Sequence, residues 1–191
     1  MRALVCSAAV LTAACVPESS DLEAAGAESS VVVPLVPVSD VAQSGVVGEP
    51  DAAGLWADLD DGPSFAAADD GATSVRTIDG RRTGILTSGF GAAPPGRVTD
   101  VVVHVRARRD ATARKGALQV RLYAGTTLLG TGARHALGAG WSNLDDAFHG
   151  LSVGGAEELR TELVLDNASP RARGTLRATS LWLDVARDLL G

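Results

Sequence analysis

The stretch Val101-Val-Val-His-Val-Arg-Ala-Arg108 determines how this chain folds. Val101, Val103, Val105 and Ala107 alternate with a second set of residues that is mostly His and Arg. Successive side chains on a β-strand point to opposite faces of the sheet, so a period of two predicts a strand with one buried and one solvent-exposed face. An amphipathic helix would instead repeat its apolar residues every three or four positions.

The same alternation recurs at residues 118–123, 159–165 and 181–185. Clusters of Gly, Asn, Pro and Asp separate these stretches, as expected for turns. Single helical turns are predicted at 55–59 and at 156–160. The chain has 191 residues, enough for one domain with a substantial core. Several half-buried strands at such spacings predict an all-β fold, an antiparallel β-sandwich of jelly-roll-like type.

A series of short motifs along the chain resembles a known group of β-sandwich modules. They are, in order, residues 55–63, Asp69-Asp70, 101–106, 122–126, Gly140-Trp141, 158–160 and 181–185. Their order resembles the jelly-roll-like β-sandwich modules of phage structural proteins and bacterial surface proteins, over residues 51–187. The resemblance implies the fold and extracellular display, and it carries over no catalytic residue.

The first fifteen residues have the pattern of a secretion signal. Arg2 supplies a positive charge, residues 3–11 form a short apolar run, and two alanines precede Cys15. This pattern resembles the lipobox of bacterial lipoproteins, although Thr12 stands where an aliphatic residue is usual. The resemblance implies cleavage before Cys15 and attachment of a lipid to its thiol, which would anchor the protein to a membrane.

The resemblance also implies a location. Val16 follows the cysteine, and in Gram-negative lipoproteins the lack of Asp at that place goes with sorting to the outer membrane. We therefore expect a secreted protein, lipid-anchored to the cell envelope at the outer membrane. The alternative is a buried N-terminal helix, since the apolar run is well short of the roughly 20 residues that span a bilayer. Cys6 would leave with the signal, so no disulfide is expected.

These features predict three parts of the chain. Residues 1–14 are a signal peptide, residues 15–50 a flexible tether and residues 51–191 the β-sandwich domain. The tether is rich in Ala, Ser, Glu, Pro and Val and has no helical or strand period. An alternative for residues 31–38 is a short edge strand, which the two prolines there disfavour because they remove hydrogen-bond donors.

Composition excludes several function classes. The formal net charge of −6 opposes binding of nucleic acid, which requires a concentrated positive field. The three histidines, His104, His135 and His149, lack the spacing of a zinc site. Residues 58–61, with Asp69-Asp70, offer carboxylates for a structural calcium ion, but turn carboxylates in water are the default. No cofactor is therefore expected.

The stretch Gly150-Leu-Ser-Val-Gly154 fits the nucleophile motif G-x-S-x-G. That motif requires a strand-turn-helix context and, in its family, a histidine later in the chain. No histidine follows Ser152, and glycines surround it, so we interpret it as a loop serine. The prediction is that the protein is not an enzyme. An extracellular hydrolase using Ser152 or a pair of carboxylates is the alternative.

Side chains on the outward strand positions are candidate ligand contacts. The candidates are Arg106, Arg108, Arg121, Tyr123, Arg177 and Trp182. Aromatic rings stack on sugars, and arginine binds carboxylate or phosphate through two parallel hydrogen bonds, so this face could hold an anionic polysaccharide. The alternative is an ordinary polar surface in which arginines pair with acids and Trp182 shields an edge.

Together these observations predict a non-catalytic surface module for adhesion, display or binding of a polysaccharide or envelope protein. Its membrane contact would be the lipid at Cys15, and nucleic acid is not an expected partner. A subunit of a virion or appendage is a further alternative, which predicts a self-complementary apolar patch and an oligomer.

Overall fold

The computed structural model of the chain describes residues 30–49, 54–59, 62–65, 73–92, 95–155, 157–169, 171 and 173–189. These residues form strands and one short 3-10 helix. The elements are β1 Ser30–Leu35, β2 Ser39–Ser44, β3 Val46–Glu49, η1 Leu55–Asp58, β4 Ser74–Thr77, β5 Thr83–Ala92, β6 Arg97–Arg109, β7 Ala117–Ala124, β8 Thr127–Ala136, β9 Ser142–Phe148, β10 Val153–Gly154, β11 Glu158–Asp166 and β12 Leu176–Asp188.

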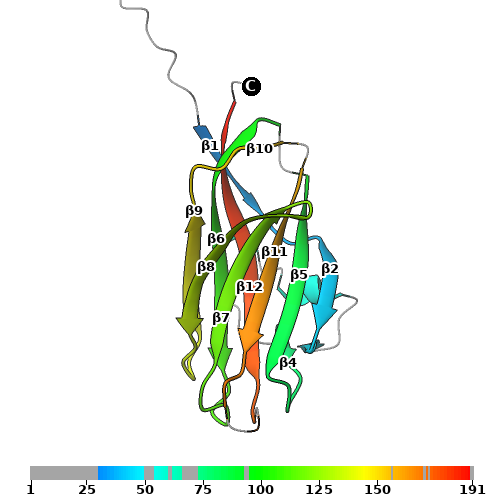
Figure 1. Cartoon of the computed structure of the whole chain (residues 1–191), viewed down its shortest axis with the longest axis vertical. Helices are drawn as coiled ribbons and strands as arrows, with labels where there is room; N and C mark the ends of the chain where they lie inside the picture. Colours follow the sequence, from blue (N-terminus) through cyan, green and yellow to red (C-terminus); the bar gives the residue numbers. More distant parts are fainter. Residues whose placement is uncertain are drawn as a thin grey trace, which may run out of the picture.

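The strands form two antiparallel sheets packed face to face (Figure 1). Sheet A has the order β10-β6-β12-β4-β3, with β1 added to β12 and β9 to β6, and sheet B has the order β2-β5-β11-β7-β8. Four pairs are nested, since β4 pairs with β12, β5 with β11, β6 with β9 and β7 with β8. A long hairpin rolled around a core gives this nesting, so the predicted jelly-roll-like β-sandwich is confirmed.

Period-two alternation explains which side chains fill the space between the sheets. On β6 the predicted inward residues, Val101, Val103, Val105 and Ala107, are fully buried. The same holds for the inward residues of the other predicted strands, which are Leu118, Val120, Leu122, Leu159, Leu163, Leu165, Leu181, Leu183 and Val185. Aliphatic side chains of this kind, removed from water in one continuous cluster, supply most of the stabilisation of such a fold.

The predicted boundary between tether and sandwich is wrong. Part of the predicted tether, from Ser30 to Glu49, forms β1, β2 and β3, which extend both sheets. Residues Ser30 to Leu35 pair with Asp188 to Leu183, and Val46 is buried in the core. Pro34 is tolerated because β1 is an edge strand, whose outer side needs no donors. The signal peptide and the first part of the predicted tether lie outside the described residues.

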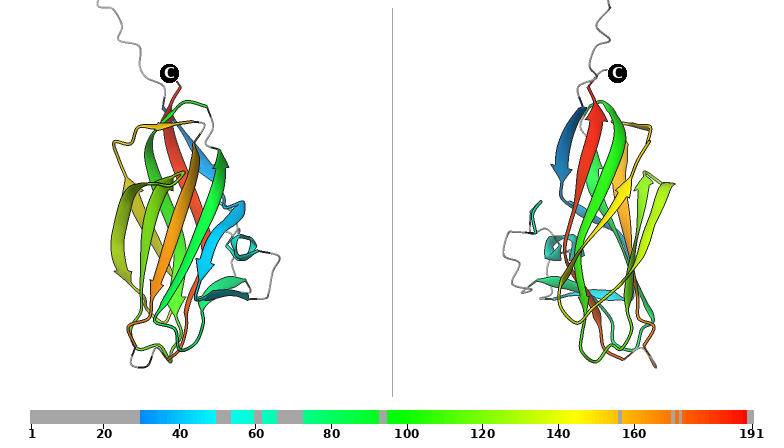
Figure 2. Two further views of the ribbon diagram at one scale, coloured as in Figure 1. Left: turned by 45° about the vertical axis from the view of Figure 1, so that its right-hand side comes forward. Right: turned by 90° about the vertical axis from the view of Figure 1, so that its left-hand side faces the viewer.

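One of the two predicted helical turns is present. Residues 55–58 form η1, whereas residues 158–160 belong to β11. Figure 2 shows η1 on the outer side of sheet A, where the backbone N–H of Leu181 donates to the carbonyl of Leu59 at 3.1 Å. A backbone N–H lies in the plane of its sheet, so this bond places Leu59 along the edge of β12, between the parts of β12 that pair with β4 and with β1.

The two ends of the sandwich differ in what they carry. Ser30 pairs with Asp188, so the first described strand begins where the last one ends, at the upper end in Figure 1. The β6–β7 and β11–β12 connections lie at the opposite end. Among the described residues, no helix has the length and apolar character required to cross a membrane.

Candidate functional site

The six predicted ligand contacts do not form one surface. Arg106, Arg108, Arg177 and Trp182 lie in sheet A, whereas Arg121 and Tyr123 lie in sheet B. All six are at outward positions of their strands. Alternation explains this for five of them, whereas Arg177 has the parity of the inward Leu181 and faces outward because of the β-bulge between Ala178 and Ser180. Because the outer faces of a sandwich point in opposite directions, the two groups cannot contact one stretch of ligand.

On sheet B, each arginine located in a strand is paired with a carboxylate. Arg121 Nη1 lies 2.6 Å from Glu162 Oε1, and Arg160 Nε donates to Glu158 Oε2 at 2.9 Å. Arg134 pairs with Asp166. Tyr123 lies directly opposite Arg160 in the ladder. The interpretation of this face as an ordinary polar surface is therefore the better one.

Glu162 also affects the protonation of its partner. Its hydrogen bond and negative charge raise the pKa of Arg121 above the ordinary value, so the guanidinium stays charged at every pH of interest. Glu162 therefore already occupies the position at Arg121 that the carboxylate of a ligand would take. A ligand would have to displace Glu162 to engage Arg121.

Sheet A carries a different arrangement, which we call the arginine row. It consists of Arg76, Arg177 and Arg108, which lie directly opposite one another on β4, β12 and β6. Like charges directly opposite on neighbouring strands repel. Two carboxylates offset part of this repulsion, because Glu49 pairs with both Arg76 and Arg177, and Asp110 accepts from Arg177 Nε at 3.1 Å.

Arg108 lies at the end of the row that has no carboxylate. Its guanidinium lies over the ring of Trp141, 4.6 Å from the ring centroid, and both residues are half-buried. Arg106, two positions along β6, also faces outward. Across the part of the chain that the structure describes, neither arginine forms an ion pair, and the Nε of each is buried without a hydrogen-bond partner. The combination of two unpaired guanidiniums and an aromatic ring is the strongest candidate site on either face.

Trp182 lies on the same face, but a ligand cannot reach it as the chain is folded. It is 5% exposed, since Phe65 packs against its ring at 4.4 Å and His104 stacks on it at 4.6 Å. His104 in turn contacts the carboxylates of Asp145 at 2.7 Å and Asp184 at 3.1 Å. We call Phe65, His104 and Trp182 the aromatic cluster. Trp182 is neither core nor platform, because it is outside the sandwich yet covered.

The other histidines are also held by aspartates. His135 contacts Asp146 at 3.1 Å, and His149 contacts Asp100 at 2.9 Å. The hydrogen bond from His149 lowers the pKa of Asp100 below its ordinary value. Both members of this second pair are substantially exposed, so water screens the interaction.

Ser152 is exposed and lies between β9 and β10, not in a strand-turn-helix context. Its side chain makes no hydrogen bond within the described ranges. Those ranges also contain no group of three His, Cys, Asp or Glu residues arranged to hold a metal ion. Asp60, Asp61, Asp69 and Asp70, on which the calcium alternative depends, lie outside the described residues.

Two members of the candidate site were missed by the sequence analysis. Arg76 lies in β4, a strand of only four residues that shows no clear alternation. Trp141 lies just before β9, beside the turn that precedes it. Neither position reveals its neighbours, because the row forms only when β4, β12 and β6 come together in the sheet.

Comparisons with known proteins were made for sequence and for structure. No family model matches the chain, and neither does any curated protein sequence. Similar solved structures exist at low identity. A carbohydrate binding module from Cellvibrio mixtus lichenase 5A, solved with cellotriose, is 15% identical with a TM-score of 0.40, covering 81% of this chain and 96% of that one.

Two further structures are of comparable similarity. A xylan-binding domain from Paenibacillus barcinonensis is 11% identical with a TM-score of 0.45, covering 84% of this chain and 98% of that one. A Stig cyclase from Fischerella sp. TAU is 14% identical with a TM-score of 0.48, covering 84% of this chain and 99% of that one. Binding domains and an enzyme are both in this group, so function has to be argued from the side chains of this chain.

Proposed function

We propose that this protein is a non-catalytic module that binds an anionic polysaccharide on the outer face of sheet A. The observation that carries the proposal is the pair Arg106 and Arg108, which face outward without a carboxylate partner in the described chain, with Arg108 over the ring of Trp141. Each arginine in a strand of the opposite face has such a partner.

The charges of the site support an acidic ligand. Four guanidiniums, those of the arginine row and Arg106, face two carboxylates, Glu49 and Asp110. An anionic group bound between Arg106 and Arg108 would reduce the repulsion among these guanidiniums. Planar guanidinium binds carboxylate or sulfate through two parallel hydrogen bonds, which are stronger than neutral ones.

Spacing along the strand favours an extended ligand. Residues two apart on a strand are separated by roughly 6.6 Å and point to the same face. Arg106 and Arg108 can therefore contact successive charged groups of one chain. The ring of Trp141, against Arg108, offers an apolar surface to a sugar ring at that end of the pair.

Retention of the purified chain on immobilised polysaccharides tests the proposal. The wild type should be retained by an acidic polymer such as polygalacturonate and not by neutral dextran. The Arg106→Gln/Arg108→Gln variant should lose at least about tenfold in affinity, because each charge-assisted contact contributes on the order of 1.5 kcal/mol. Binding should also weaken with added salt.

A matched variant controls for net charge. Arg121→Gln/Arg160→Gln removes the same two charges from sheet B, where the arginines face Glu162 and Glu158. It should bind like the wild type. Equal loss in both variants, or failure of the wild type to bind any acidic polymer, would contradict the proposal and favour a protein partner or a structural role.

The proposal includes secretion and a lipid anchor at Cys15. The supporting observation is where the chain enters the sandwich. β1 begins at the end where Ser30 pairs with Asp188, whereas the arginine row lies near the other end, at the last residues of β6 and the first of β12. A tether on β1 would leave the row facing away from the membrane. Cys15→Ser should abolish incorporation of labelled palmitate in a bacterial host and release the protein from the membrane fraction.

A further inference from the structure

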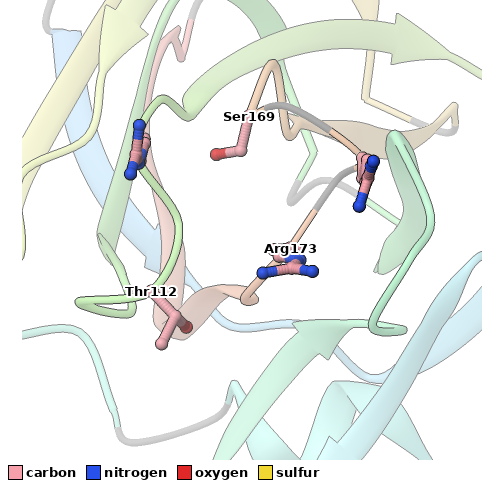
Figure 3. Close-up of a pocket in the computed structure, with 5 residues that line it drawn as sticks. Thr112, Ser169 and Arg173 are labelled. Atoms are coloured by element: carbon pink, nitrogen blue, oxygen red, sulfur yellow. The ribbon is translucent and has the colours of Figure 1, made fainter.

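The end of the sandwich opposite β1 carries a basic pocket. Its lining residues come from the β6–β7 and β11–β12 connections, and they are Thr112, Arg114, Ser169, Arg171 and Arg173. The pocket has a volume of 370 Å³. Figure 3 shows Thr112, Ser169 and Arg173 around one open space.

Two buried polar side chains fix the pocket, because Ser169 links the two connections and Asn167 holds the β11–β12 connection in its own fold. Ser169, 2% exposed, donates from its hydroxyl to the carbonyl of Lys115 and accepts from the Lys115 N–H, both at 3.0 Å. Asn167, fully buried, donates to the carbonyl of Gly174 at 2.8 Å and accepts from the Ser169 N–H at 3.1 Å. Buried hydrogen bonds of this kind fix a loop, so the pocket is formed before a ligand arrives.

Backbone packing adds to this support. Gly174 has a φ of 76°, and a Cβ atom at that position would lie 2.4 Å from the backbone nitrogen of Ala113. Only glycine allows this approach of the two connections. Arg171 also has a positive φ, 58°, which is uncommon for a residue other than glycine. The loop geometry that presents the arginines is therefore an enforced one.

The three arginines of the pocket have no acidic partner among the described residues. Carboxylates next to the two connections have other partners. Asp110 accepts from Arg177 and Thr175, and Asp166 pairs with Arg134. Asp79, in the β4–β5 connection, accepts from the backbone N–H of Gly174. Three arginines thus line one pocket without an ion-pair partner among the described residues, in a chain whose formal net charge is −6. Mutual repulsion of this kind is relieved when an anion binds.

We propose that this pocket binds a compact oxyanion of charge two, a phosphate or sulfate group carried by a larger ligand. Guanidinium groups supply the planar donor pairs that match such oxygens. The volume of 370 Å³ accommodates the oxyanion together with part of its carrier. The pocket shares no lining residue with the arginine row, so this site does not depend on the proposed polysaccharide site.

Titration of the full ¹⁵N-labelled chain with inorganic phosphate and, separately, sulfate tests the inference by NMR at a constant ionic strength of about 0.1 M. Amide signals of the two connections should shift and saturate, with tighter binding than for acetate or chloride. The tighter of the two divalent anions identifies the ester. Arg171→Gln/Arg173→Gln should weaken binding at least about tenfold, since two charge-assisted contacts are removed.

The matched control is Arg97→Gln/Arg187→Gln, which removes two charges at the opposite end, where Arg97 pairs with Asp188. This variant should bind phosphate within about twofold of the wild type, because the removed charges lie at the far end of the sandwich and charges beyond about 10 Å are screened. Absence of saturation, no preference over acetate, or an equal loss in the control would overturn the inference. Loss only in the pocket variant would support it, whatever the polysaccharide experiment gives.

Discussion

The two outer faces of the sandwich use arginine in opposite ways. On sheet B, Arg121, Arg134 and Arg160 each face a carboxylate supplied by the protein. On sheet A, three arginines lie opposite one another in a row. Arg106 and Arg108 on that sheet face no carboxylate in the described chain. An outward arginine is therefore not by itself a sign of a binding site. What distinguishes Arg106 and Arg108 from the arginines of sheet B is that no neighbouring strand in the described chain brings an acid alongside them.

Removal of the N-terminal strands should have the largest effect on both faces. The chain 51–191 lacks β1 and β3 of sheet A and β2 of sheet B, and it also loses the buried side chain of Val46. We expect its free energy of unfolding to fall by about 5 kcal/mol relative to the chain 30–191, from lost burial and ladder hydrogen bonds. Urea unfolding followed by tryptophan fluorescence measures this, and equal midpoints for the two chains would contradict it.

The second largest effect should be the difference in stability loss between alanine substitutions of one aromatic residue on each face. Trp182→Ala removes a side chain that is 5% exposed and packed against Phe65 and His104, so we expect a loss of about 3 kcal/mol. Tyr123→Ala on sheet B removes a half-buried ring and should lower stability by about 1 kcal/mol. Urea midpoints of the two variants test this order. A stable Trp182→Ala variant with lost polysaccharide binding would mean that Trp182 is accessible.

Substitution of Trp141 tests the difference between the two faces in ligand affinity. Trp141→Ala removes the ring under Arg108, and affinity for the acidic polymer should fall about fivefold, with a stability change below about 1 kcal/mol. Tyr123→Ala, on the other face, should leave the affinity unchanged. Both affinities can be read from retention on the immobilised polymer. The interpretation fails if the two variants lose affinity equally.

The carboxylate partners on sheet B should contribute little to stability individually. A double-mutant cycle of Arg121→Ala and Glu162→Ala should give a coupling free energy of about 0.5 kcal/mol, because the pair is partly exposed and screened. The role of Glu162 would then be to occupy Arg121 more than to stabilise the fold. A coupling several times larger would show that sheet B's pairs are structural.

The smallest effect concerns Asp100. Its folded-state pKa is lowered, mainly by the hydrogen bond from His149. The ionised Asp100 therefore stabilises the fold at pH values above its unfolded pKa of about 3.9. This stabilisation is lost as the pH falls through the folded-state pKa. The difference in melting temperature between the wild type and Asp100→Asn should therefore shrink as pH is lowered below about 4. A difference that stays constant from pH 6 to about 3 would show that Asp100 makes no such contribution.

Much of the fold was predictable because its signal is local. Inward positions such as Val103 and Leu163 follow from alternation alone, and both are buried. The strand nature of residues 30–49 was not predictable, because β1 becomes a strand through pairing with β12, more than 140 positions later in the chain. A valine-rich segment with prolines has no other feature that separates an edge strand from a tether.

The candidate sites show the same limit. Alternation correctly assigned five of the six predicted contacts to outward positions, whereas Arg177, which has the parity of the inward Leu181, faces outward only because of the β-bulge between Ala178 and Ser180. It also could not say that Arg121 and Tyr123 belong to a different sheet from Arg106 and Arg108. Nor could it show that Phe65 covers Trp182, since the two residues are far apart in the chain. The basic pocket likewise joins Arg114 with Arg171 and Arg173 from two separate connections.

The sequence alone determined the class of the fold, the strands with strong alternation and the face of each strand that is buried. These depend on the pattern of side-chain hydrophobicity at neighbouring positions, which can be read directly from the sequence. Tertiary structure alone decided which strands lie side by side, and hence which arginines are paired with acids, which form a row and which converge on a pocket. The physical reason is that the energy of a charge depends on its distance to other charges and to water, and folding sets both.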